Sequence, residues 1–245
     1  MKRLLVLLIL SLSFAACRAQ IPSPPTEQPS PAEPAPDGTL TLTFLDVGQG
    51  DAVLIQAPEG QNVLIDGGRY QNRVLEQLQA LGVTSLDLVI ASHADFDHIH
   101  GLIEAVRHYR PRFFIDNGVP HTTQTYLELL QAVQQAGSQL LEPTARTINL
   151  GEVALSILPP PGDPSLGQND NSVGVVVQYG SFRASLTGDS EAAEWNYWES
   201  LGVLRPVSVH KASHHGSENG DTPLAMSRLS PETVVISVGL ENNYG

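Results

Sequence analysis

The sequence predicts an α+β fold in which two β-sheets pack face to face and helices cover their outer sides. Three observations lead to this prediction. Segments that alternate apolar and polar residues, joined by turn signals, occur in two groups along the chain. Each group is followed by strands and helices in turn, an order typical of a sheet with helices packed on it. Apolar residues make up 41% of the chain, which is enough to form a core.

The first half of the folded part begins with hairpin strands and continues with strand–helix units. Pro58-Glu59-Gly60 supplies a hairpin turn, and Gly82 and Gly137 each end a helix. The run 86–91 is apolar at every position except Asp87 and indicates a buried strand. The predicted strands cover residues 40–47, 52–57, 62–65, 86–91 and 113–115, and the predicted helices cover residues 74–81, 99–107 and 125–136.

The second half repeats this order of hairpin strands followed by strand–helix units. Gly180-Ser181 forms the turn between two strands of alternating character. The predicted strands cover residues 153–158, 173–179, 182–186, 206–210 and 234–238, and the predicted helices cover residues 191–201 and 223–229.

The N-terminal residues predict export and a membrane anchor. Lys2 and Arg3 precede a short apolar run that ends in Ala15-Ala16, so residues 1–17 form a predicted signal peptide. Cys17 then resembles the lipidated first residue of a bacterial lipoprotein; the alternative is an ordinary cleaved signal. Residues 18–38 are rich in proline and predict an extended linker, which leaves 39–245 as the folded domain. We therefore expect a lipoprotein that faces the periplasm or the cell exterior.

The composition excludes two kinds of chemistry. The chain has 13 basic and 26 acidic residues and a formal charge of −13, which argues against a broad basic surface for nucleic acid. Cys17 is the only cysteine, so an intrachain disulfide or a site built on several thiolates is impossible.

The strongest chemical signal is the segment Ser92-His93-Ala94-Asp95-Phe96-Asp97-His98, which follows the buried strand 86–91. Four ligand-capable side chains in six residues would cost several kcal/mol if buried without partners. They form either a metal site or a solvated loop, and the alternation of imidazole and carboxylate favours the metal site. Histidine and carboxylate ligands without thiolate suit Zn²⁺, Mn²⁺ or iron.

Two further candidates also follow predicted strands. Asp189, in Thr187-Gly188-Asp189, is either a metal ligand or the N-cap of the helix that starts near residue 191. His214 and His215 stand before Gly216, and adjacent histidines in this position favour a functional role. Lys211, the only lysine after the signal, either meets a phosphate or extends its stem along the surface at a strand end.

Taken in chain order, these motifs strongly resemble the metallo-β-lactamase-fold domain of the ComEC competence proteins and their lipoprotein relatives. The resemblance runs from about Thr39 to the end of the chain. It implies a four-layer αββα sandwich with a dinuclear metal centre and hydrolase activity, most often on phosphodiesters. The motifs that carry it are Asp46-Val47-Gly48-Gln49-Gly50-Asp51, Asp66-Gly67-Gly68, the His93–His98 cluster, Asn169-Asp170-Asn171-Ser172, Thr187-Gly188-Asp189 and His214-His215-Gly216-Ser217.

The resemblance also implies a role for each site residue. His93 and Asp95 bind the first metal, Asp97 and His98 bind the second, and Asp189 bridges the two. One of His214 and His215 completes the second metal, and the other faces the substrate. The cofactors implied are two divalent metal ions, with zinc preferred and manganese or iron as alternatives.

The sequence departs from the family pattern in three places. Asp95 stands where the general pattern has a second histidine, and Asn169-Asp170-Asn171 stands where a third is expected, so the first metal is either weakly held or uses Asp170. The chain stops at Asn243-Tyr244-Gly245, where such domains usually continue into another strand and helix, so we expect either a truncated sequence or a domain that lacks its C-terminal element. Asp66 either orients a ligand or belongs to the turn at Gly67-Gly68.

These residues predict a metal-dependent phosphodiesterase or nuclease outside the cytoplasm, with DNA among its candidate substrates. Asp97 or Asp189 orients the nucleophilic water, and a histidine of the 214–215 pair serves the leaving oxygen. Two alternatives remain: a β-lactam or thioester hydrolase on the same fold, and a lipoprotein with a decayed site that binds DNA or cell-wall polymer.

Lipidation of Cys17 predicts that wild-type protein fractionates with membranes and that Cys17→Ser releases it, because a serine carries no thioether-linked lipid. Fractionation of cells followed by immunoblotting measures the distribution. Wild-type protein found entirely in the soluble fraction would contradict the anchor.

Overall fold

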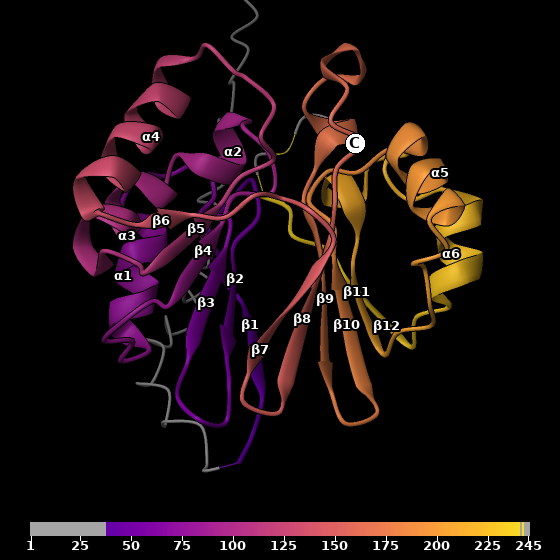
Figure 1. The fold of residues 1–245 in the computed structure, drawn as a ribbon, viewed down its shortest axis with the longest axis horizontal. Coiled ribbons are helices and arrows are strands. Elements are labelled where there is room, and N and C mark those ends of the chain that lie inside the picture. The colour runs from indigo at the N-terminus through magenta and orange to yellow at the C-terminus, as the bar shows by residue number, and fades with distance from the viewer. Residues whose placement is uncertain (1–37, 241, 243–245) are drawn as a thin grey trace, which may run out of the picture. The chain divides into compact units, whose positions relative to one another are not determined.

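Two six-stranded β-sheets pack face to face, and helices cover the outer side of each (Figure 1). The computed structural model describes residues 38–240 and residue 242. The predicted signal peptide, Cys17 and all of the predicted linker except Gly38 lie outside the described residues. This four-layer αββα arrangement confirms the fold class that the sequence predicts.

The first sheet has the strand order β1-β2-β3-β4-β5-β6. Strands β1 to β3 pair antiparallel as hairpins, and β3 to β6 pair parallel. Its strands are β1 (Thr41–Phe44), β2 (Val53–Gln56), β3 (Asn62–Ile65), β4 (Leu88–Ile90), β5 (Phe113–Ile115) and β6 (Gln139–Leu140).

The second sheet has the order β12-β11-β10-β9-β8-β7 and repeats the same plan. Strands β7 to β10 pair antiparallel, and β10 to β12 pair parallel. Its strands are β7 (Arg146–Leu150), β8 (Val153–Leu158), β9 (Gly174–Tyr179), β10 (Phe182–Leu186), β11 (Val209–Lys211) and β12 (Thr233–Val235).

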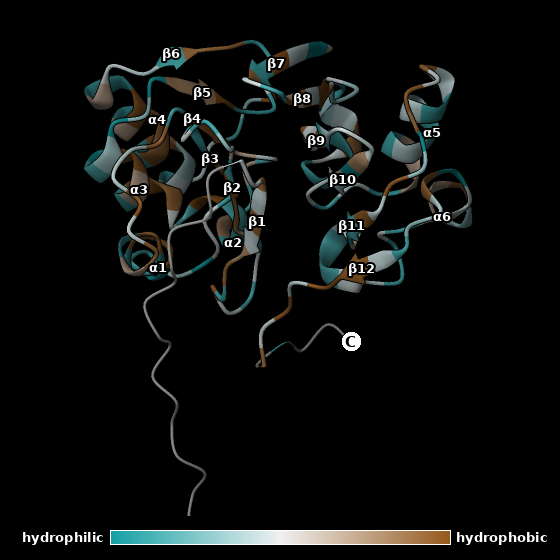
Figure 2. Cartoon of the chain, turned by 90° about the horizontal axis from the view of Figure 1, so that it is seen from below, coloured by the Kyte–Doolittle hydropathy of each residue, from teal (hydrophilic) through white to brown (hydrophobic). Residues whose placement is uncertain are grey.

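The helices divide between the two outer faces, as Figures 1 and 2 show from two directions. On the first sheet lie α1 (Arg73–Ala80), α3 (Leu102–Tyr109) and α4 (Gln124–Ala136), with the short α2 (Phe96–Ile99) following β4. On the second sheet lie α5 (Ala192–Ser200) and α6 (Pro223–Leu229). Three 3₁₀ turns complete the chain: η1 (Pro164–Leu166), η2 (Asn169–Asn171) and η3 (Ser213–Gly216). Among the described residues, no helix is both long and apolar enough to cross a membrane.

Alternation along the strands explains why the sheets pack on both faces. In β3, Val63 and Ile65 point into the core between the two sheets, whereas Leu64 packs against the helices of the first sheet. In β9, Val175 and Val177 face the central core and Val176 faces α5 and α6. Successive side chains of a strand point to opposite faces, so a strand that is apolar at every position must be covered on both sides.

The structure differs from the predicted elements in three ways. Strands β6 and β7 were not predicted: β6 is two exposed residues, and β7 is an edge strand whose polar residues weaken the apolar signal. The predicted helix 99–107 is divided into α2 and α3, with His100 and Gly101 between them. The remaining strands and helices are present with their ends moved by a few residues.

The division between α2 and α3 lets a loop of the first sheet approach closely. Gly67, in the loop after β3, donates its N–H to the carbonyl of His98, and Gly101 donates to the carbonyl of Gly68. A Cβ at Gly101 would overlap the carbonyl oxygen of Gly67. This contact holds the loop that carries Asp66 against the helix that carries Asp97 and His98.

Because Gly101 has a helical φ of −71°, alanine fits its backbone, and at an open helical site it would stabilise by roughly 0.5–1 kcal/mol. Here the overlap with Gly67 should reverse the sign, and Gly101→Ala should destabilise by about 1–3 kcal/mol. Urea unfolding in excess chelator measures the change. A midpoint equal to or above that of wild type would contradict the close approach.

Candidate metal centre

The carboxylate of Asp189 is buried at the centre of a group of four histidines. Its Oδ2 lies 3.2 Å from Nε2 of His98, 3.4 Å from Nε2 of His215, 3.8 Å from Nε2 of His214 and 3.9 Å from Nε2 of His93. These residues come from the segments that follow β4, β10 and β11, with His98 in α2 and the His214–His215 pair in η3. The carboxyl ends of the parallel strands in the two sheets therefore place them at one edge of the sandwich.

Two further carboxylates flank this centre on different histidines. Asp95 Oδ2 lies 3.5 Å from Nε2 of His93, and Asp97 Oδ2 lies 3.5 Å from Nε2 of His215. The site thus consists of two imidazole–carboxylate pairs, His93–Asp95 and His215–Asp97. The Asp189 carboxylate lies close to the histidine of each pair and is shared between them. All seven predicted metal ligands are brought together.

A carboxylate behind the histidines orients two of them. Asp66 Oδ2 accepts hydrogen bonds from Nδ1 of His98 at 2.9 Å and from the Ser92 hydroxyl at 2.7 Å. The Ser92 oxygen lies 3.0 Å from Nδ1 of His93, and the Ser92 N–H donates to Asp66 Oδ1. Because the Ser92 hydroxyl donates its proton to Asp66, the Ser92 oxygen accepts a hydrogen bond from the Nδ1–H group of His93. Both imidazoles therefore direct Nε2 into the site, as metal-binding histidines do when a carboxylate or hydroxyl holds the other nitrogen.

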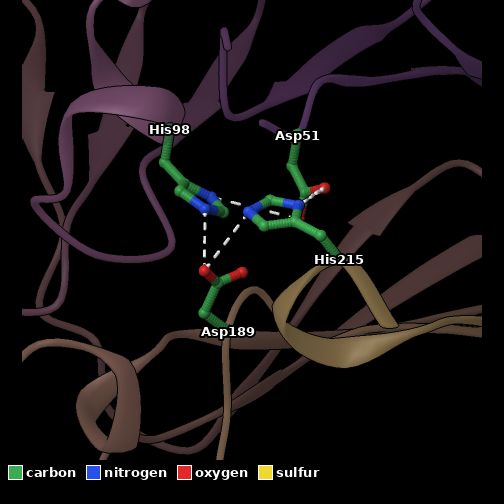
Figure 3. Close-up of side chains that lie close together, drawn as sticks. All are labelled: Asp51, His98, Asp189 and His215. Atoms are coloured by element: carbon green, nitrogen blue, oxygen red, sulfur yellow. Dashed lines mark ion pairs between the residues drawn. The ribbon is translucent and has the colours of Figure 1, made fainter. Parts of the chain in front are cut away.

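The residues fit divalent cations because several buried ligand atoms have no hydrogen-bond partner in the described part of the chain. Nε2 of His93, His98 and His215 and Oδ1 of Asp51 and Asp189 are buried without a hydrogen bond among the described residues. Buried polar atoms are rarely left unpaired, so such a group of donors needs an explanation. Figure 3 shows Asp51, His98, Asp189 and His215 converging, and one ligand atom from each lies within 4.8 Å of the others. We infer that these atoms face cations.

The electrostatics of the group favour bound protons or cations. Burial raises the pKa of the Asp189 carboxyl, but His98 and His215 outweigh burial and hold this pKa well below its usual range. Burial lowers the pKa of His215, but the nearby carboxylates of Asp189, Asp51 and Asp97 raise it to about 11. A histidine must be neutral to bind a metal ion, so metal binding here would release protons from the histidines.

The backbone at three of these positions adopts a strained conformation. Asp66, His214 and His215 have positive φ values of 57°, 48° and 56°. Such conformations cost roughly 1–3 kcal/mol each in a residue other than glycine and persist where the surroundings enforce them. Ser213, in the same turn, is held by Thr187 at 2.7 Å and by Asp221, which accepts its N–H. The turn is thereby fixed in the conformation that presents both histidines.

Asp51 is a site residue to which sequence reasoning assigned no role. It is buried and forms an ion pair with Lys211, whose side chain is 1% exposed. Burial raises the pKa of Asp51, but the Lys211 ammonium and His215 lower it below its usual value, and Asp51 in turn raises the pKa of Lys211. Both predictions for Lys211 are therefore wrong, since it reaches neither solvent nor an open phosphate site. The only sequence signal for Asp51 was its place in the motif before β2.

The two readings of Asp189 are separated by what caps helix α5. Asp170 Oδ1 accepts the N–H groups of Glu191 and Glu194 at 3.2 and 2.9 Å. Asp170 therefore caps the helix, and the Asp189 carboxylate is directed at the histidines instead. Among the described residues, no hydrogen bond or ion pair joins the side chains of 169–171 to His93.

A pocket of about 430 Å³ opens over the carboxylates and histidines. Asp95 and Asp97 are partly exposed within it, whereas His93 and His98 are fully buried beneath. The remaining walls carry polar side chains rather than an apolar surface. The lining residues are Gln49, Asp95, Asp97, Asp189, His214, His215, Ser217, Asn219 and Asn242.

The fold and the shared-carboxylate site define a class of protein. Residues 45–238 match the Metallo-beta-lactamase superfamily, and the chain belongs to that family. The resemblance to competence proteins is confirmed as well. The chain is 27% identical to ComE operon protein 3 of Bacillus subtilis over 226 residues, which cover 83% of the chain. It is 27% identical to the competence protein ComA of Neisseria gonorrhoeae over 216 residues, which cover 86% of it.

The matched region is only part of these relatives, because the chain spans 29% of the length of each. Among solved structures, the chain resembles CmlA, a diiron β-hydroxylase from Streptomyces venezuelae, with a TM-score of 0.56 and 18% identity. That match covers 85% of this chain and 46% of CmlA. At this identity the likeness concerns the fold alone.

The contacts of Asp66 predict that Asp66→Asn weakens metal binding by roughly 10–100-fold. The amide NH₂ replaces one of the two oxygens that accept from His98 Nδ1 and from the hydroxyl and N–H of Ser92. Chelator competition with metal analysis measures the affinity. Asp87→Asn is the matched control. Asp87 lies in the loop before β4, and its Oδ2 accepts the N–H of Asn62, the first residue of β3. Equal metal affinity in Asp66→Asn and Asp87→Asn would contradict the orienting role.

Proposed function

We propose that this protein is a metal-dependent phosphodiesterase that acts outside the cytoplasm. The single observation that carries the proposal is the Asp189 carboxylate, which two imidazole–carboxylate pairs share. A shared carboxylate suits two cations close together, and two-metal sites of this kind favour in-line attack on phosphorus. His93, Asp95 and Asp189 would hold one ion, and Asp97, His98, His215 and Asp189 the other.

When bound, the metals would supply a water of lowered pKa and neutralise charge on the phosphoryl oxygens. The residues of this chain have the remaining tasks. Asp97 and Asp189 accept hydrogen bonds and orient the attacking water. His214 is half-buried at the pocket, with Nδ1 3.1 Å from Glu191 Oε1, so it is placed to donate a proton to the leaving oxygen. Asp51 is neutralised by Lys211 and holds His215 through its Nδ1 at 3.3 Å.

The proposed substrate is a phosphodiester, with DNA as the leading candidate. Three carboxylates (Asp95, Asp97 and Asp189) line the pocket, and they would repel a phosphate unless cations offset their charge. One of the two relatives is named a competence protein, which supports a nucleic-acid substrate. The charge of −13 argues that any contact with DNA is confined to the site.

We further propose that the metals are zinc and that lipid on Cys17 anchors the protein to a membrane. Imidazole with carboxylate is a common donor set for zinc, and manganese and iron suit the same atoms. The anchor rests on the Ala15-Ala16-Cys17 sequence and the proline-rich linker, and it would place the site outside the cytoplasm.

The proposal is tested with Asp189→Asn, which removes the negative charge that the two cations would share. We expect turnover of a bis-aryl phosphate to fall by orders of magnitude and metal content to fall below two per chain. The matched control is Asp170→Asn, the same change at the cap of α5; asparagine caps as well as aspartate, so this variant should resemble wild type.

Three results would contradict the proposal. Wild-type turnover in Asp189→Asn would exclude a bridging role, and hydrolysis of nitrocefin without hydrolysis of any phosphodiester would favour the lactam-hydrolase alternative. Metal retained by wild-type protein without turnover of any substrate would favour a binding protein.

A further inference from the structure

A second pocket of about 250 Å³ lies beside the metal centre. Gln49 lines both pockets, and its Oε1 accepts the N–H of Gly239 at 3.2 Å. The second pocket lies between the loop after β1, the loop before α1 and the segment 238–240. We call it the Arg69 pocket; it is lined by Asp46, Gly48, Gln49, Arg69, Tyr70, Arg73, Val238, Gly239 and Leu240.

Backbone hydrogen bonds fix the Arg69 pocket to the residues of the metal centre. The Gly68 N–H donates to the carbonyl of Asp51, and the Arg69 N–H donates to that of Gln49. Nδ1 of His100, which follows α2, lies 2.7 Å from the Arg69 carbonyl. The chain from 66 to 70 is thus attached to the segments that carry Asp51 and Asp97, so a ligand can contact both pockets at once.

The Arg69 pocket carries positive charge in an acidic protein. Arg73 is paired with Asp46 at 2.7 Å, but these side chains are 41% and 79% exposed. An exposed pair of this kind contributes only about 0–1 kcal/mol, so an incoming anion can compete with Asp46. Arg69 is exposed and has no ion pair among the described residues. Two guanidinium groups and one carboxylate leave a net positive charge.

One exposed aromatic side chain, Tyr70, lines the Arg69 pocket, and a second, Phe96, contacts His100, whose Nδ1 lies at the Arg69 carbonyl. Tyr70 is 44% exposed and Phe96 is 45% exposed, and they are the two aromatic residues among the large exposed apolar side chains of the described chain. Phe96 lies between Asp95 and Asp97 in sequence and stacks on His100, with ring centroids 4.3 Å apart. Exposed aromatic rings beside arginines are the arrangement that single-stranded nucleic acids bind, since bases stack on the rings and phosphates pair with the cations.

We propose that the Arg69 pocket binds the nucleotide next to the hydrolysed phosphodiester in a single-stranded nucleic acid. Arg69 and Arg73 bind the neighbouring phosphate, and Tyr70 stacks on an unpaired base. The identification of the substrate rests on the proposed phosphodiesterase function, whereas binding itself does not require turnover. The subsite also explains how an acidic protein holds a polyanion: the contacts are confined to this rim and to the metal centre.

The test measures binding of a fluorescein-labelled phosphorothioate oligothymidylate to the metal-loaded protein at several salt concentrations. The double variant Arg69→Ala/Arg73→Ala should lower the slope of log K against log salt by about 0.7, because the two arginines bind one phosphate and single strands give about 0.7 per phosphate contact. Tyr70→Ala should weaken binding by roughly 5- to 150-fold, while Tyr70→Phe, which keeps the ring, should bind as wild type does.

The matched control is Arg107→Ala/Arg228→Ala, which removes the same charge from two exposed, ion-paired arginines on α3 and α6. An unchanged salt slope in the Arg69/Arg73 variant, or an equal loss in the control, would overturn the subsite.

Failure of the proposed nucleotide subsite is distinguishable from failure of the proposed phosphodiesterase function. If wild type hydrolyses bis-aryl phosphate but the affinity for the oligonucleotide does not depend on Arg69, Tyr70 and Arg73, the subsite proposal is wrong and the phosphodiesterase proposal stands. If binding depends on these residues and no phosphodiester is hydrolysed, the subsite stands and the phosphodiesterase fails.

Discussion

The burial of the Asp189 carboxylate among four histidines is the interaction on which the rest of this structure depends. A buried carboxylate needs positive charge or hydrogen-bond donors close by, and none of the nearest partners is adjacent to Asp189 in sequence. The imidazoles reach it because parallel strands of both sheets end at the same edge of the sandwich. The site therefore forms only when the two sheets pack against each other.

A second layer of contacts fixes the direction of each ligand atom. Asp66 and Ser92 hold Nδ1 of His98 and His93, and the carbonyl of Ser237 lies 3.0 Å from Nδ1 of His215. Each contact leaves Nε2 directed into the site. The Asp51–Lys211 pair adds a negative group close to His215 without adding net charge to the interior. This balance matters because unpaired buried charges are strongly destabilising.

The charge distribution also separates two tasks. Carboxylates concentrate at the metal centre, where cations would offset them, whereas the nearby arginines lie on an exposed rim with Tyr70. A substrate that carries several phosphates could contact both the metal centre and the arginines, whereas a small neutral substrate has no charge for either region to bind. The acidic remainder of the surface would limit non-specific association with nucleic acid.

The sequence by itself determined the two-sheet class, most strands and helices, and the ligand types in the His93–His98 cluster, because alternation and helical spacing are local patterns. Only the tertiary structure decided what depends on distant residues. It assigned the cap of α5 to Asp170 rather than Asp189, and it joined Asp51 to Lys211 in the interior. It also revealed β7, an edge strand whose place depends on pairing with β8. Ion pairs and hydrogen bonds between remote segments leave no periodic trace in the sequence, so folding alone brings these partners together.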